Sequence, residues 1–151
     1  MLPHAGLIEP SMPRDEEALL RAKLHVRGGR KRLSKGDNAD AVAALYDAFI
    51  SAMWRFVVSP DLWKELVIHG TDDLSDDLTL FHVMKRSGAI TSSFDEDDFM
   101  KFATMLDQAL DGQAVSFDNA AFLKKYEAVM KELGVLPIKQ GELPERDSIT
   151  V

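Results

Sequence analysis

The sequence contains no cysteine, which excludes disulfide bonds, iron–sulfur clusters, cysteine-ligated zinc and thiol nucleophiles. It also contains no uninterrupted apolar run close to the ~20 residues that span a bilayer. Residues 1–13 lack both the basic start and the continuous apolar stretch of a secretory signal. We therefore expect a chain that folds without cross-links, outside the membrane and in the cytoplasm.

Short catalytic motifs are missing as well. The 4 histidines, at positions 4, 25, 69 and 82, include no pair four residues apart, so the local signature of a histidine-built zinc site is absent. No serine lies in a Gly-x-Ser-x-Gly elbow, and no phosphate-binding loop of the Gly-x-x-x-x-Gly-Lys-Ser/Thr kind occurs. These absences favour a protein that acts by binding rather than by catalysis.

The size and composition indicate one globular domain. With 151 residues, 46% of them hydrophobic and 28% charged, the chain is too apolar to be disordered and large enough for one core. No segment alternates apolar and polar residues as a strand does. We expect an all-α, up-and-down bundle of about five to six helices over residues 13–134, an irregular lead-in over 1–12, and an extended or mobile tail over 135–151.

The helices follow from apolar residues spaced three and four apart. Residues 38–58 are apolar on nearly every side, which predicts the central helix, and Trp54 and Trp63 are expected in the core. Gly36 suits the left-handed end of the first helix, and Asp37 suits the cap of the second. Ser93 and Glu96 have the spacing of a capping box. The helix that follows has a predicted core stripe of Phe99, Ala103, Leu106 and Leu110. The predicted helices cover residues 13–34, 38–58, 60–69, 75–86, 94–111 and 118–133.

Gly28 and Gly29 lie inside the first predicted helix. A glycine there costs about 1 kcal/mol relative to alanine, so the pair marks either a break or a place where another helix comes close. Gly29 falls on the apolar stripe of this helix, together with Leu19, Val26 and Leu33. We therefore expect close approach of a neighbouring helix.

Charge is distributed unevenly along the chain. The formal net charge is -7, but the charged residues within 14–35 are mostly basic and those within 61–98 mostly acidic. A bipolar surface of this kind can steer a charged partner or pair two copies. The predicted contact is the basic face of the first helix, formed by Lys23, Arg27, Arg30 and Lys31. Binding of a protein through this face is favoured, and binding of RNA is the alternative.

Two acidic clusters are candidate metal sites. Asp72, Asp73, Asp76 and Asp77 repeat a pair of aspartates, and carboxylates four apart on a helix could hold Mg²⁺ and, through it, a phosphate-containing small molecule. Each pair also has the form of a helix cap, with acids at the positive end of the helix dipole. Residues 95–98 are acidic too, and we interpret them as the first turn of a helix.

Part of the chain resembles the HEPN group of helical-bundle domains. The resemblance runs from about Leu20 to Leu110 and rests on RAKLHVRGGRKRLSKGDNADAVAALYDAFISAMWRFV and, later, LTLFHVMKRSGAI, which contains His82. It implies two long antiparallel helices joined by a Gly-Asp turn. Ribonuclease members of the group carry an arginine and a histidine, separated by four to six intervening residues, near the end of the domain. Here Arg21 and His25 are too close together and lie on the wrong helix.

The resemblance therefore implies a non-catalytic member, and such members dimerise and often partner a nucleotidyltransferase or bind a nucleotide. Together with the missing motifs, this predicts a binding or regulatory protein that works as a homodimer or with a protein partner. No cofactor is expected. The competing hypotheses are a Mg²⁺-dependent enzyme using Asp72, Asp73, Asp76 and Asp77, and an RNA-binding bundle using the basic face.

Overall fold

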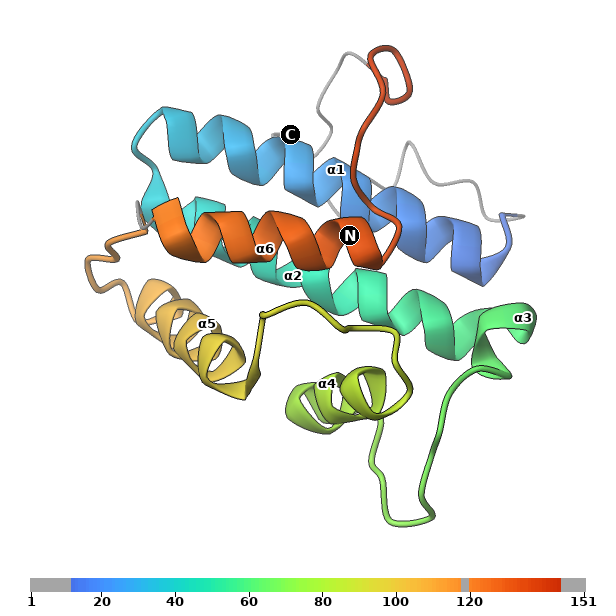
Figure 1. Cartoon of the computed structure of the whole chain (residues 1–151). Coiled ribbons are helices and arrows are strands. Elements are labelled where there is room, and N and C mark those ends of the chain that lie inside the picture. Colours follow the sequence, from blue (N-terminus) through green and yellow to red (C-terminus); the bar gives the residue numbers. More distant parts are fainter. Residues whose placement is uncertain (1–11, 118–119, 145–151) are drawn as a thin grey trace.

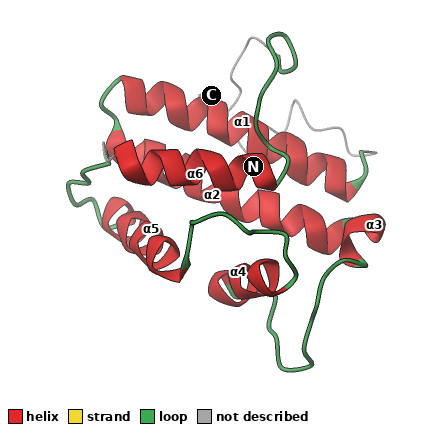
Figure 2. Ribbon diagram, in the orientation of Figure 1, coloured by secondary structure: helices red, strands yellow, loops and turns green. Residues whose placement is uncertain are grey.

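The computed structural model describes residues 12–117 and 120–144 of the chain. Within these residues the protein forms six helices and no strand (Figure 2), which confirms the predicted all-α bundle. Residues 1–11 and 145–151, which make up most of the predicted lead-in and part of the predicted tail, lie outside the described residues. The helices are α1 (Arg14–Ser34), α2 (Asn38–Val58), α3 (Pro60–Trp63), α4 (Asp77–Arg86), α5 (Glu96–Leu110) and α6 (Ala120–Glu132).

The bundle is built around α2. In Figure 1, α1 and α2 form an antiparallel hairpin, α6 lies along it, and α4 and α5 lie on the other side of α2. The hydroxyl of Tyr126 on α6 donates to the carbonyl of Leu45 on α2 over 2.7 Å, which fixes the two helices against each other. α2 is also the one described helix that is long and apolar enough to cross a membrane. Since 61% of its apolar window is buried inside the protein, its composition has an explanation in the core of the bundle.

The two long helices begin and end as predicted. α1 continues through Gly28 and Gly29 without a break, and both glycines are buried. Gly36 has a φ of 78°, the left-handed conformation that ends a helix with little strain. Asp37 occupies the N-cap position of α2, as predicted, but its side chain accepts no capping hydrogen bond.

The end of α3 and the cap of α5 differ from the prediction. α3 ends at Trp63 rather than near Gly70, because the following N–H groups bond three residues back, in tight turns. Trp63 is 43% exposed there and is not a core residue. At the start of α5 the capping box is formed by Asp95 and Asp98 rather than by Ser93 and Glu96.

The first part of the predicted tail packs against the bundle. Val135, Leu136 and Leu143 are buried, and the segment of residues 135–144 runs beside α1. At its start, Nη2 of Arg55 donates to the carbonyl of Leu133 over 3.0 Å and so binds the end of α6 to α2. Residues 135–144 form no helix and turn at residues 139–142, and the contacts with α1 hold them in place.

Candidate functional site

The four cations predicted to form a binding face on α1 have different surroundings. Nζ of Lys23 lies 2.6 Å from Oε2 of Glu142, and Arg27 donates to the carbonyl of Pro144. Arg30 and Lys31 are exposed. The C-terminal segment of residues 135–144 therefore occupies the part of the face that carries Lys23 and Arg27, while Arg30 and Lys31 reach solvent.

Asp72 and Asp73 lie in the connector between α3 and α4. Asp72 accepts hydrogen bonds from Arg86 and from the N–H of His69, each over 2.7 Å. Asp73 accepts from the hydroxyl and the N–H of Ser75, over 2.6 and 3.0 Å. The hydrogen bond from Arg86 lowers the pKa of Asp72, and those from Ser75 lower the pKa of Asp73. Both carboxylates are therefore ionised at neutral pH, and their hydrogen bonds stabilise the conformation of the connector.

Asp76 and Asp77 lie at the start of α4. Asp76 caps the helix by accepting from the N–H and the hydroxyl of Thr79, over 3.0 and 2.8 Å. Asp77 accepts from the hydroxyl of Tyr46 over 2.9 Å, and burial together with this hydrogen bond raises the pKa of Tyr46. The capping alternative is therefore confirmed for Asp76, and Asp77 lies in the first turn of α4, whereas Asp72 and Asp73 precede the helix and cap none. In residues 12–117 and 120–144, no three His, Asp or Glu side chains are placed to hold a metal ion.

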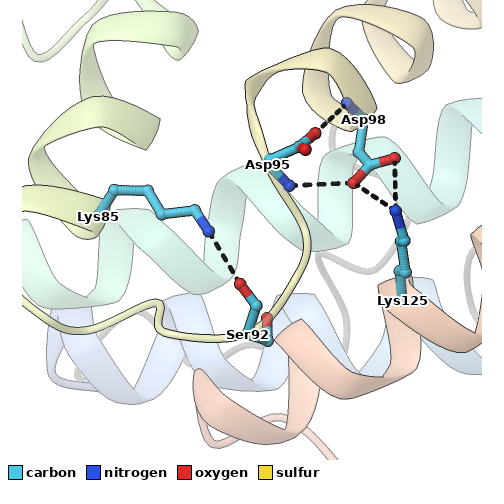
Figure 3. A network of polar contacts seen from close by, with 5 residues as sticks. All are labelled: Lys85, Ser92, Asp95, Asp98 and Lys125. Atoms are coloured by element: carbon cyan, nitrogen blue, oxygen red, sulfur yellow. Dashed lines mark hydrogen bonds and ion pairs between the residues drawn. The ribbon is translucent and has the colours of Figure 1, made fainter.

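The acids at the start of α5 belong to a network that joins three helices (Figure 3). Asp95 and Asp98 each accept the other's backbone N–H over 3.0 Å, and Nζ of Lys125 on α6 lies 3.3 Å from Oδ2 of Asp98. From α4, Lys85 donates to the carbonyl of Ser92 over 3.0 Å. The network stabilises the loop between α4 and α5, so the predicted first-turn acids here are structural groups.

Glu132 on α6 holds the same loop from the other side. Its carboxylate accepts from the N–H and the hydroxyl of Thr91, over 2.9 and 2.6 Å, and from the N–H of Ser92 over 2.8 Å. Burial alone would raise the pKa of Glu132, but these hydrogen bonds outweigh burial and lower it. The ionised form is therefore favoured in the folded protein.

Glu132→Gln should lower the free energy of unfolding by about 1–2 kcal/mol at neutral pH, because a neutral amide accepts these bonds less strongly. The depressed pKa stabilises the folded state above the ordinary value of 4.5, and this contribution is lost as the pH falls through the folded-state pKa. Urea unfolding at neutral pH and at about pH 3 should show the difference from the unmodified protein shrinking. Glu65→Gln, at an exposed position, is the control. A difference that is the same at both pH values would contradict the assignment.

The three histidines within the described residues, His25, His69 and His82, are dispersed. His25 is nearly buried, with Nε2 3.4 Å from Oδ2 of Asp47 on α2. Asp47 also accepts two hydrogen bonds of 3.0 Å from Arg21, in a bidentate pair that links α1 to α2. His82 contacts Glu96 on the surface. His4 lies outside the described residues.

An apolar groove along α5 was not anticipated from the sequence. It has a volume of about 670 Å³ and lies between α5, residues 116–117 and the start of α6. Met100 is 46% exposed on one wall. The available signal was that Met100 and Met105 are apolar but fall off the predicted core stripe of this helix. The lining residues are Asp97, Met100, Lys101, Thr104, Met105, Ser116, Phe117 and Phe122.

Two methionines and two phenylalanines, Met100, Met105, Phe117 and Phe122, form the walls of this α5 groove together with four polar or charged residues. The apolar side chains of the lining suit contact with apolar side chains of another molecule, and the polar lining residues lie next to them. Comparison of the chain with protein-family models, with curated proteins and with solved structures gives no significant match.

Proposed function

We propose that this protein is a non-enzymatic binding or regulatory protein that receives an amphipathic helix of a partner protein in the α5 groove. The groove itself is the observation that supports this function. Apolar openings on a soluble protein commonly mark interaction sites. Methionine adapts its shape to the surface it meets, so Met100 and Met105 suit a groove that takes up a partner's side chains.

Charge around the groove indicates the kind of helix that would bind. Asp97 lines the groove. Asp107 and Asp111 are exposed, and they follow the lining residues Met100 and Thr104 by seven positions each. Residues seven apart lie on one side of a helix. Lys101 is the one cation among the lining residues. The partner helix should therefore carry leucine- or isoleucine-like residues on one side and Lys or Arg residues beside them.

The resemblance to HEPN domains suggests a class of partner. A nucleotidyltransferase with such a basic amphipathic helix would fit both the resemblance and the groove. The alternatives are a second copy of this chain in the groove and an RNA bound to the basic face of α1. RNA binding would need cations that remain accessible, and the C-terminal segment already contacts Lys23 and Arg27.

The binding test uses a defined probe: a synthetic helix of leucine, alanine and lysine, as long as the 15-residue α5, with leucines spaced three and four apart. Met100→Glu should weaken its binding at least about tenfold, because a charge is placed against an apolar face. Leu110→Glu is the matched control. Leu110 belongs to the same helix and is 71% exposed, but it does not line the groove.

Methyl NMR of the methionines locates the bound helix. The methyl signals of Met100 and Met105 should shift on binding, and those of the fully buried Met53 and Met84 should stay in place. Equal weakening by Met100→Glu and Leu110→Glu would contradict the proposed site, as would shifts confined to other parts of the protein. Sedimentation of the unliganded protein shows whether a second copy competes for the groove.

A further inference from the structure

A second opening lies between α1 and the C-terminal segment of residues 135–144, away from the α5 groove. Its volume is about 330 Å³, within the range of small-molecule sites. The residues that line it include three cations and no acid. They are Arg27, Arg30, Ile138, Lys139, Gln140, Gly141 and Leu143.

The loop wall of this pocket is held in a fixed shape. The N–H of Glu142 donates to the carbonyl of Lys139 over 3.0 Å, and Gly141 takes a φ of 80°, which a side chain would disfavour. The carboxylate of Glu142 accepts from the N–H of Lys139 over 3.4 Å and pairs with Lys23 on α1. Glu142 therefore binds the loop to α1, and it does not line the pocket.

The helix wall supplies the guanidinium groups. Arg27 donates to the carbonyl of Pro144, which positions its side chain beside the loop. Arg30 is half exposed, and its Nη2 lies 3.8 Å from Oε1 of Glu127, which is itself exposed. An ion pair of this kind contributes little in water. Arg30 can therefore turn toward a ligand at small cost.

We propose that this pocket binds a small molecule carrying a phosphate monoester beside a short apolar body. Arginine matches the oxygens of a phosphate group, and Lys139 adds a third positive charge from the opposite wall. Ile138 and Leu143 would contact the apolar body, and Gln140 can donate or accept a hydrogen bond. The pocket is small and bounded by a loop, which favours one anionic group over an extended polymer. This site is independent of the α5 groove.

The probes are phenyl phosphate, inorganic phosphate and benzoate, titrated into the full chain and followed by calorimetry. Phenyl phosphate should bind with a Kd below about 1 mM, tighter than inorganic phosphate, which lacks the apolar body, and tighter than benzoate, which has one charge and two oxygens. Its affinity should fall as salt is added. Benzoate binding as tightly as phenyl phosphate would overturn the assignment to a phosphate ligand.

Variants place the ligand in the pocket. Arg30→Gln combined with Lys139→Gln should weaken phenyl phosphate binding at least about tenfold, whereas Lys31→Gln, one residue along α1 but outside the pocket, should leave it unchanged. Glu127→Gln should strengthen binding, because it removes a carboxylate that lies 3.8 Å from Arg30. Arg27 is kept, since it also holds Pro144. No binding by the unmodified protein, or equal loss in Lys31→Gln, would overturn the proposal. An oligonucleotide that binds and depends on Lys31 would show an RNA-binding face instead.

Discussion

Phe49→Ala should lower the free energy of unfolding by about 3–5 kcal/mol. Small domains unfold at a cost of roughly 5–15 kcal/mol, so this one substitution would remove a large part of the stability. Phe49 is fully buried at the middle of α2. Its ring centroid lies 5.3–6.5 Å from those of five other aromatic rings, which come from α4, α5, α6 and the loop before α5: Phe81, Phe94, Phe99, Phe102 and Tyr126.

The size of this effect follows from the number of elements that meet at one side chain. Removing the ring would leave a cavity whose walls belong to separate helices, and these can close it only by moving relative to α2. Edge-to-face contacts with Phe94 and Phe81 would be lost at the same time.

Phe56→Ala is the matched control, because Phe56 is on the same side of α2, two turns later, and is also buried. It should lose less stability, since it lies at the end of the core rather than among the rings. Urea unfolding followed by circular dichroism measures both variants, and Phe49→Leu should recover more than half of the loss. Equal losses for Phe49→Ala and Phe56→Ala would show that Phe49 does not hold the aromatic core together.

The sequence predicted α1 and α2 well because local signals agreed there. Apolar stripes, the turn at Gly36 and the apolar surroundings of Phe49 all indicate the same two helices. Such agreement between neighbouring residues needs no knowledge of the rest of the fold. The start of α5 was harder, since Ser93, Asp95 and Asp98 are all suitable capping residues. The choice of Asp95 depends on the Asp98 side chain, which also contacts Lys125 of a helix far along the chain.

The buried side of α5 was predicted only in part. Phe99 is in the core, but Leu110, placed on the same stripe, is 71% exposed, and Phe102 is fully buried. Positions 102 and 103 are both one turn after Phe99, so periodicity does not distinguish them. Tertiary packing distinguishes the two positions, because the ring of Phe102 stacks on that of Phe117 with an interplanar angle of 8°.

Segments without helical periodicity were the main source of unpredicted sites. Phe117 forms a wall of the α5 groove, and Leu143 lines the pocket beside α1, yet both follow irregular stretches of sequence. Their burial depends on helices from other parts of the chain. Similarly, the charges of Lys23 and Asp76 can be read from the sequence, but their partners cannot. Only the fold shows that Lys23 pairs with Glu142 and that Asp76 accepts a hydrogen bond from Thr79.

Gly29→Val should lower the free energy of unfolding by about 2–3 kcal/mol through overpacking. The prediction that a glycine of α1 allows a close approach is confirmed at this position. A Cβ atom added to Gly29 would lie 2.7 Å from both Cγ and Cδ2 of Leu45, and 3.4 Å from the carbonyl oxygen of Ala41. Leu45 is almost fully buried and has little room to move. Valine would add two further methyl groups, so α1 and α2 would have to separate.

Lys31→Val is the control for the helix preference of valine, since Lys31 is exposed on the same helix; it should cost less than about 1 kcal/mol. Leu45→Ala provides a second check. If the clash is with Leu45, the double variant Gly29→Val with Leu45→Ala should lose less stability than the two single losses together, because the smaller side chain makes room for valine. Thermal and urea unfolding of the four variants measure this coupling. Strict additivity, or a loss in Gly29→Val no larger than in Lys31→Val, would mean that α1 and α2 do not meet at Gly29.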